Sequence, residues 1–144
     1  MQQYWHMQIH PSDLEFGKDN VHEILEKQQV IGLGGIEDWP KGESYIRRFC
    51  DEMNVNDIVA IKNGGKLIAL VQVIGGAYQV HDGDWMVNRR PIRILDWEIE
   101  EKDLPHTRDT LVRCVNDVAT TQVIKQWHER VVQSLLKRGM SVTV

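Results

Sequence analysis

The chain has 144 residues, of which 42% are hydrophobic and 26% are charged. This length and balance are typical of one globular domain spanning residues 1–144, and they exclude an extended disordered chain. The formal net charge of −4 excludes a strongly basic protein that coats nucleic acid indiscriminately, although it leaves room for a local basic patch.

No segment has the pattern of a membrane span or a secretion signal. The most apolar stretch, residues 58–74, is interrupted by polar residues and glycines at 62–66, and the first residues lack a basic start before a long apolar run. We therefore expect a cytoplasmic protein with no membrane partner. Cys50 and Cys114 lie far apart without a CxxC pair, which favours two core thiols over a disulfide or a zinc site.

The first half of the chain alternates strand and helix signals. Residues 4–9 form an aromatic-rich alternating run that predicts a strand, and residues 30–33 predict a second one. Between them, residues 20–27 carry apolar side chains at helical spacing after possible N-cap residues. A polar loop follows at 36–40, and the helical period of residues 44–53 predicts another helix.

The clearest feature is a predicted hairpin in the middle of the chain. Apolar runs at 57–62 and 66–74 flank Asn63-Gly64-Gly65, and Asn and Gly accept the positive φ angles of tight hairpin turns. Continuous apolar runs indicate central strands that are buried on both faces.

The second half predicts one more long strand and two helices. Residues 90–97 alternate basic and apolar side chains, with Ile92 and Ile94 facing inward and Arg93 outward. A short helix is expected around residues 110–115 and a longer one at 121–137. The buried stripe of the longer helix is expected to be Val123, Ile124, Trp127, Val131, Leu135 and Leu136. This order predicts an α+β fold, with a curved, mostly antiparallel sheet or barrel and flanking helices.

No convergent set of reactive residues stands out in the sequence. The motifs of serine hydrolases, zinc peptidases, P-loop proteins and zinc deaminases are absent. The glycine-rich run at 31–35 lacks the spacing of a dinucleotide-binding loop and is interpreted as a turn that needs small residues. His6 and His10 share one side of the first strand, but no third ligand accompanies them. We therefore expect no catalytic residue, no metal and no cofactor.

Two of the five tryptophans differ from the rest. Trp39 and Trp85 lie in polar loops, whereas Trp5, Trp97 and Trp127 occupy strand or helix positions typical of core packing. Two indoles that face one another across a cleft would form a slot for a flat ligand such as a nucleobase. Packing of both indoles against their own domain is the alternative.

Arginines follow both of these loops. They are Arg47 and Arg48 after the first loop, and Arg89, Arg90 and Arg93 after the second. Guanidinium groups beside a stacking pocket would hold the phosphates on either side of an extruded base. A solvated charged face is the alternative for these residues.

Several motifs together resemble the EVE and YTH modules of the PUA-like superfamily. The matching segments are residues 4–7 (YWHM), 17–21 (GKDNV), the loop with Trp39, 53–59 (MNVNDIV, like the EVE strand KVGDLV), 67–78 and 89–95 (RRPIRIL, like RRPVRWL). The resemblance spans residues 4–97, and it rests on the order and spacing of motifs that are each weak alone.

The resemblance implies a function and a set of site residues. YTH domains capture N6-methyladenine in RNA, and EVE-like domains are DNA-reading N-terminal parts of McrB-type modification-dependent restriction systems. By the same resemblance, Trp39 and Trp85 form an aromatic cage and Asn20 contacts the base edge. Asp38 would suit the exocyclic amine of cytosine or adenine. The chain departs from the YTH pattern at residues 40–42, where Pro-Lys-Gly replaces a serine–threonine run.

The main hypothesis is therefore a non-catalytic reader that flips a modified, methylated base into an aromatic pocket. We favour DNA over RNA as its partner and expect further domains or subunits of a restriction or defence system. One alternative is another PUA-like activity, either an RNA-binding domain or a nuclease or hydrolase of the ASCH type. A second alternative is a protein–protein adaptor that docks through exposed aromatic residues.

Overall fold

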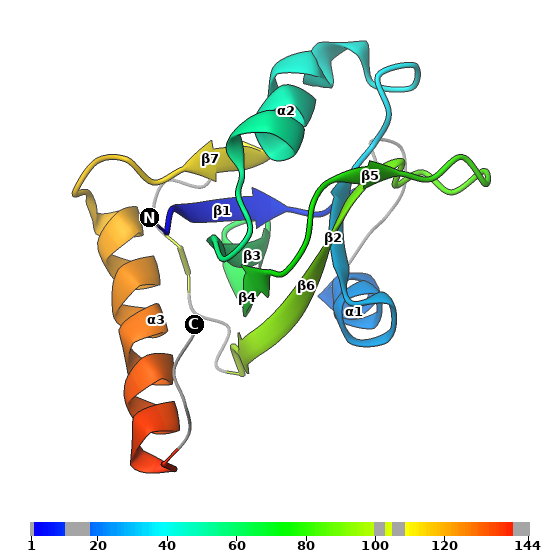
Figure 1. Ribbon diagram of the computed structural model, residues 1–144. Coiled ribbons are helices and arrows are strands. Elements are labelled where there is room, and N and C mark those ends of the chain that lie inside the picture. Colours follow the sequence, from blue (N-terminus) through cyan, green and yellow to red (C-terminus); the bar gives the residue numbers. More distant parts are fainter. Residues whose placement is uncertain (1, 11–17, 100–102, 105–108, 140–144) are drawn as a thin grey trace.

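Figure 1 shows the computed structural model, which describes residues 2–10, 18–99, 103–104 and 109–139. Its strands are β1 (Tyr4–Gln8), β2 (Val30–Leu33), β3 (Ile58–Asn63), β4 (Lys66–Val73), β5 (Tyr78–Gln79), β6 (Asn88–Trp97) and β7 (Leu111–Arg113). Its α-helices are α1 (Lys18–Glu23), α2 (Glu43–Arg47) and α3 (Ala119–Lys137). Two π-helical turns, η1 (Ile24–Gln28) and η3 (Arg48–Glu52), continue α1 and α2, and the 3-10 turn η2 (Pro40–Gly42) precedes α2.

The strands form one curled sheet in the order β2-β6-β4-β3-β1-β7, and β5 pairs with the first residues of β6. Strands β1 and β3 run parallel, and the other pairings of the described strands are antiparallel. Helix α3 lies along one face of the sheet and α1 along the other (Figure 1). The predicted α+β architecture with a curved, mostly antiparallel sheet is therefore confirmed.

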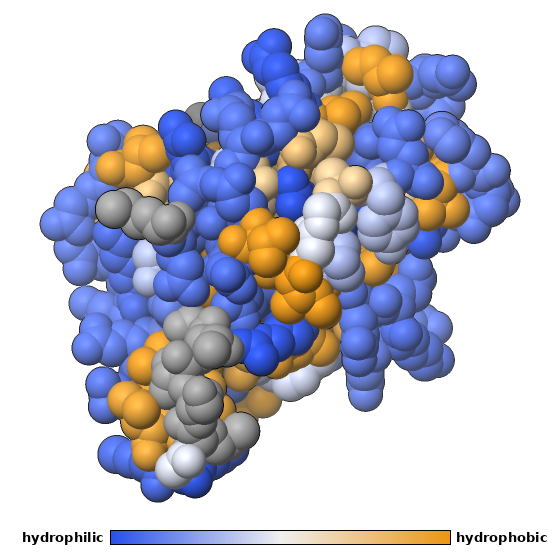
Figure 2. Space-filling model, viewed as in Figure 1, coloured by the Kyte–Doolittle hydropathy of each residue, from blue (hydrophilic) through white to orange (hydrophobic). Residues whose placement is uncertain are grey.

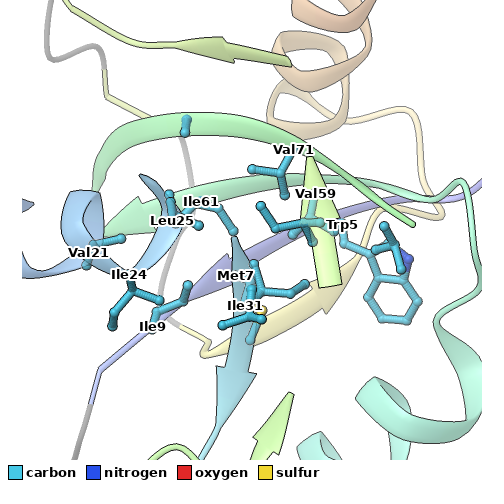
Figure 3. Packing of buried hydrophobic residues seen from close by; sticks show 14 of the residues in the cluster. Trp5, Met7, Ile9, Val21, Ile24, Leu25, Ile31, Val59, Ile61 and Val71 are labelled. Carbon is cyan, nitrogen blue, oxygen red and sulfur yellow. The ribbon is translucent and has the colours of Figure 1, made fainter. Parts of the chain in front are cut away.

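Both faces of the central strands are buried. Trp5 and Val59 belong to a large apolar cluster on the face that α1 and η3 cover (Figure 3). On the opposite face, Ile58 packs in a second cluster with Ile124 and Trp127 of α3. Because successive side chains of a strand point to opposite faces, this two-sided burial explains the continuous apolar runs of β3 and β4.

The hairpin between β3 and β4 confirms the turn that the sequence predicts. Asn63 already pairs with Lys66 in the ladder, so the turn itself consists of Gly64 and Gly65. Gly64 has a φ of +62°, which lies in the left-handed region where a side chain is unfavourable. The backbone therefore favours a glycine at this position.

The prediction of a helix around residues 110–115 is wrong, because residues 111–113 form strand β7. This strand pairs antiparallel with β1, with Leu111 opposite Met7 and Arg113 opposite Trp5. Leu111 is fully buried in the main cluster. The segment is too short to form a stable helix, and pairing with the free edge of β1 satisfies its backbone instead.

Helix α3 confirms the predicted long helix but only part of its buried stripe. Ile124 and Trp127 are buried, and Trp127 donates from Nε1 to Asp96 Oδ2 at 2.7 Å. Leu136 is 52% exposed, so its predicted burial is wrong, because the last turn of α3 extends past the sheet (Figure 1). Within the described ranges, no helix combines the length and hydrophobicity that a membrane crossing requires.

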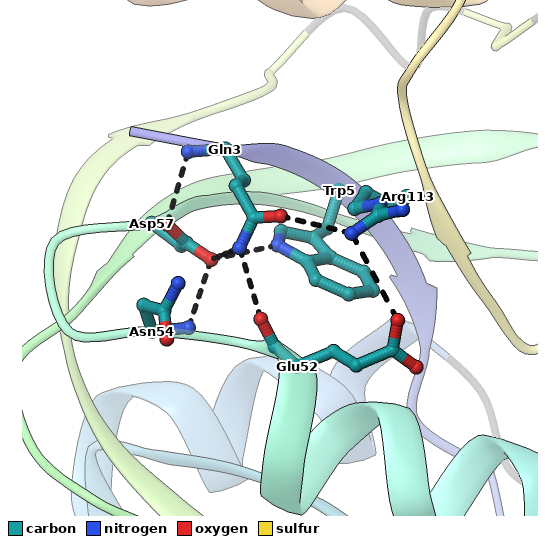
Figure 4. A network of polar contacts seen from close by, with 6 residues as sticks. All are labelled: Gln3, Trp5, Glu52, Asn54, Asp57 and Arg113. Carbon is teal, nitrogen blue, oxygen red and sulfur yellow. Dashed lines mark hydrogen bonds and ion pairs between the residues drawn. The ribbon is translucent and has the colours of Figure 1, made fainter. Parts of the chain in front are cut away.

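A buried carboxylate joins the start of β1 to the start of β3 (Figure 4). Asp57, which is 0% exposed, accepts hydrogen bonds from the backbone N–H and the side-chain amide of Gln3 at 3.0 and 2.9 Å. It also accepts from Trp5 Nε1 and from the backbone N–H of Asn54, each at 2.9 Å. Four donors converge on one charged group, so the carboxylate is fully compensated although it is buried.

We expect Asp57→Asn to destabilise the protein by about 3 kcal/mol, because an amide nitrogen would face donors that now share a carboxylate. The free energy of unfolding in urea measures this loss. Asp51→Asn, which changes an exposed carboxylate nearby, is the matched control and should change stability by less than about 0.5 kcal/mol. Equal effects of the two substitutions would show that the Asp57 network adds no specific stability.

A buried Lys–His pair is a second polar feature that the sequence did not indicate. The Nζ atom of Lys62, which is 0% exposed, lies 2.9 Å from Nδ1 of His6. Burial lowers the pKa of Lys62 to about 8. Burial and, next, the charge of Lys62 lower the pKa of His6 to about 4, although Asp109 opposes the shift. His6 is therefore neutral at physiological pH, with Nδ1 accepting the bond from Lys62.

We expect the free energy of unfolding to fall as the pH drops from about 6.5 to about 4. The unfolded chain binds a proton on His6 near its ordinary pKa of 6.5, whereas the folded protein binds it only near 4. The stability is complete above pH 6.5, and about 3 kcal/mol of it is lost once the pH is below 4. Urea unfolding across this pH range should show that the free energy of unfolding declines less in His6→Gln than in the wild type. Equal declines in the two proteins would contradict the lowered pKa of His6.

Candidate nucleic-acid interface

The loops that carry Trp39 and Trp85 meet at Gly34. A side-chain carbon at Gly34 would lie 3.7 Å from the Trp85 carbonyl oxygen and 4.0 Å from Trp39 Cβ. Both indoles are partly buried and pack against the main apolar cluster. The structure therefore brings together two predicted site residues that are 46 positions apart in the sequence, while each also contributes to packing.

Trp39 packs on the helix that follows it. Its indole stacks on the ring of Tyr45, with centroids 5.6 Å apart and an interplanar angle of 6°. A side-chain carbon at Gly42 would lie 2.1 Å from the indole atoms Cδ2 and Cε3, so only glycine allows this close approach. The Trp39 backbone N–H also donates to Gly35 O at 2.9 Å. The position of Trp39 is therefore set by its own loop and by η2 and α2.

The loop with Trp85 is held by charged and polar contacts on both sides of it. Arg89 donates from Nε to Met86 O at 2.7 Å, and its Nη2 lies 3.4 Å from Asp84 Oδ2. Asp84 Oδ1 in turn accepts from the Met86 backbone N–H at 3.2 Å. Arg89, whose side chain is only 11% exposed, therefore stabilises the loop through its contacts with Asp84 and Met86.

Asn88 connects the two loops, and its role could not be read from the sequence. This residue is 1% exposed, and its Nδ2 donates to Gly34 O at 2.9 Å. Its Oδ1 accepts from Gln79 Nε2 at 3.2 Å and contacts Cys50 Sγ at 3.9 Å. One amide thus ties the end of β2 to β5 and η3.

The glycine-rich run at 31–35 is explained by close packing rather than by a turn. Gly32 lies within β2, where a side-chain carbon would come within 2.3 Å of Met86 Cγ. At Gly35 the same atom would lie 3.1 Å from Val87 Cγ2. Small residues are therefore needed because the segment after Trp85 crosses directly over them. The sequence thus correctly predicts a need for small residues here, but the cause is packing against Met86 and Val87 and not a turn.

Asn20, which the family resemblance assigns to the base edge, lies on α1. Asn20 lies in the first turn of α1, two residues before His22, which stacks on Trp97 with ring centroids 4.1 Å apart. Trp97 ends β6, whereas Trp85 precedes the beginning of the same strand. Asn20 is therefore near the opposite end of β6. Asp38, by contrast, is exposed and directly precedes Trp39.

Apart from Arg89, which contacts Asp84 and Met86, the predicted phosphate-binding arginines fall into two groups. Arg47, Arg48 and Arg93 are exposed. Arg90 is only 4% exposed and points into the protein. Its guanidinium donates to the carbonyl oxygens of Phe49 (2.8 Å), Gly75 (3.1 Å), Cys50 (3.1 Å) and Met53 (2.6 Å). Because these bonds occupy its donors inside the fold, we leave Arg90 out of the phosphate contacts and assign it a structural role.

Comparison with known proteins defines the fold. No model of a known protein family matches the chain, and no curated protein matches it. Among solved structures, a hypothetical protein from Leishmania major is similar with a TM-score of 0.52 and 13% identity, covering 90% of this chain and 97% of that one. Human THYN1 protein, solved in complex with DNA that contains 5-methylcytosine, has a TM-score of 0.53 and 10% identity, covering 89% and 98%.

These likenesses extend over nearly the whole chain, at identities that show a shared fold and nothing more. The curled sheet with helices on both faces is the PUA-like fold of the EVE and YTH type, as the sequence motifs predict. The fold class is thus established, and what the chain does with it follows from the residues on its surface.

We expect Gly42→Ala to displace the Trp39 indole, because the added carbon would overlap the ring. Overpacking of this kind costs typically about 1–3 kcal/mol. Near-ultraviolet circular dichroism should show an altered tryptophan signal, and urea unfolding should show the loss of stability. Gly76→Ala is the matched control, since its added carbon would meet nothing within 4 Å. An unchanged tryptophan signal in Gly42→Ala would contradict the described packing of Trp39.

Proposed function

We propose that the chain is a non-catalytic reader that binds nucleic acid carrying a modified base. The observation that supports this most is the fold that it shares along nearly its whole length with a protein solved in complex with 5-methylcytosine DNA. The meeting of the Trp39 and Trp85 loops at Gly34 adds support from this chain's own residues. DNA is the partner that we favour over RNA.

The base-binding site that we propose lies between these two loops. Trp39 and Trp85 supply aromatic surface, and stacking of a base on such a ring is worth roughly 1–3 kcal/mol. The exposed carboxylate of Asp38 would accept a hydrogen bond from an exocyclic amine of the base. A base in a duplex must leave the stack to reach such a site, so recognition would involve base flipping.

The phosphates on either side of the base would be held by Arg47, Arg48 and Arg93, whose side chains are exposed. Arg93 is oriented by a hydrogen bond of 2.7 Å from its Nε to Gln72 Oε1. Arg89 contributes indirectly, because it braces the loop with Trp85. Guanidinium groups suit this task because their fork of donors matches phosphate oxygens.

A reader that does no chemistry needs an effector to act on what it detects. We therefore propose that this chain works with further domains or subunits of a modification-dependent restriction or defence system. The adaptor alternative calls for a large contiguous apolar surface. On the face shown in Figure 2, hydrophilic residues predominate around a hydrophobic area near the centre, which favours a polar partner such as nucleic acid.

We expect the protein to bind one modified oligonucleotide more tightly than the unmodified strand, and Trp39→Ala and Trp85→Ala each to abolish that preference. Fluorescence anisotropy at fixed salt measures this, with DNA and RNA carrying no modification, N6-methyladenine, 5-methylcytosine or 5-hydroxymethylcytosine. Trp97→Ala, which alters a partly buried indole at the other end of β6, is the control and should retain the preference. Equal binding to all oligonucleotides by the wild type would contradict the reader function.

A further inference from the structure

A groove of about 420 Å³ lies between the helical segment 43–52 and strand β7. Its charged lining comes from Arg47 and Arg48 on one side and from Arg113 on the other, together with Glu52. Trp5 and two valines, at 112 and 115, complete the lining. Arg113 lies in the segment for which the sequence predicted a helix, so its place opposite the other two arginines became visible only in the structure.

The fold holds Arg113 in a defined position. Strand β7 pairs with β1 and sets Arg113 opposite Trp5 in the ladder. Its Nη1 donates to Gln3 Oε1 at 3.2 Å and lies 3.8 Å from Glu52 Oε1 (Figure 4). Gln3 is itself fixed by Asp57, so the guanidinium is anchored through the buried network while 43% of its side chain stays exposed.

The charges of the groove differ in sign from those of the chain as a whole. Three arginines and one glutamate line it, whereas the chain has a net charge of −4. A local positive groove on an acidic protein concentrates an anionic partner at one place and repels it elsewhere. Val112 and Val115 offer apolar contact as well, which a sugar–phosphate chain can use and a small free anion cannot.

The groove is also connected to the proposed base site through Tyr45. The ring of Tyr45 stacks on Trp39 at 5.6 Å, and the guanidinium carbon of Arg48 lies 5.9 Å from the centroid of the same ring. Tyr45 donates from its hydroxyl to Asp109 Oδ1 at 3.2 Å, which ties this helix to the segment before β7. A strand whose base stacks at Trp39 would therefore pass Arg48 on its way into the groove.

We propose that this groove binds the sugar–phosphate backbone of nucleic acid that leads away from the base site, with Arg113 as its anchored phosphate contact. The inference rests on the proposed function for its class of ligand and adds the path of the backbone across the protein. Contacts to phosphate fix position and affinity without reading sequence or modification. The groove should therefore strengthen binding to modified and unmodified strands alike.

The test is the salt dependence of binding. The logarithm of the binding constant falls linearly with the logarithm of the salt concentration, and each phosphate contact to duplex DNA steepens this fall by roughly 0.9 because it releases counterions. We expect Arg113→Gln to reduce the slope by about 1, and Arg47→Gln with Arg113→Gln to reduce it by about 2. The ratio of affinities for modified and unmodified duplexes should not change. Arg130→Gln, an exposed arginine on α3, is the matched control and should leave the slope as in the wild type.

Glu52→Gln provides a second readout that loss of folding cannot mimic. Removing the carboxylate that lines the groove should increase the affinity for every duplex several-fold at low salt. The proposal would be overturned if the salt dependence of binding were the same in Arg113→Gln as in the wild type. It would also be overturned if Glu52→Gln bound duplexes more weakly than the wild type.

The two proposals fail in different ways. If the groove is assigned wrongly, Trp39→Ala still removes the preference for a modified base while the slope of Arg113→Gln stays unchanged. If the reader function is wrong, no preference exists, yet the slope on unmodified DNA still falls in Arg113→Gln. An absence of binding to every oligonucleotide would overturn both.

Discussion

A buried carboxylate, that of Asp57, joins the first residues of the chain to the central strand of the sheet. Four donors from Gln3, Trp5 and Asn54 converge on it, so it aligns the starts of β1 and β3. These two strands run parallel, and no short turn can connect parallel neighbours or set their register. The Asp57 network supplies at one end of the pair the alignment that a hairpin turn would give an antiparallel pair.

The surface features of the protein depend on this central pair. With β1 beside β3, the outer edge of β1 is open to β7, and β7 carries Arg113 into the groove beside η3. On the other side, β4 and β6 follow β3, and the start of β6 presents the loop with Trp85 to the loop with Trp39. The aromatic site and the basic groove are thus both set by the order of strands in the sheet.

Neighbouring arginines on β6 illustrate how the sheet separates structural from binding roles. Arg90 points inward and donates to four backbone carbonyls, whereas Arg93 keeps its side chain exposed. Alternation of side chains along a strand assigns them to opposite faces, although the charges are identical. Asn88, which lies on the buried face with Arg90, uses its amide to hold the end of β2. Buried polar groups therefore organise the loops that exposed groups would use for binding.

The sequence by itself determined the elements that depend on local physics. Hydrophobic periodicity located strands β1 to β4, strand β6 and the long helix, and the Asn-Gly-Gly turn located the hairpin, because these signals lie within a few residues of one another. It also placed Trp39 and Trp85 in loops. It mistook residues 111–113 for a helix, because only the free edge of β1 makes them a strand.

Only the tertiary structure decided which side chains meet. It buried Arg90, stacked His22 on Trp97, and assembled the groove. Each of these outcomes depends on residues that are distant in the chain, such as Gln3 and Arg113, which are 110 positions apart. Contacts at such separations leave no periodic signal in a single sequence, because they are set by strand order and not by local propensity.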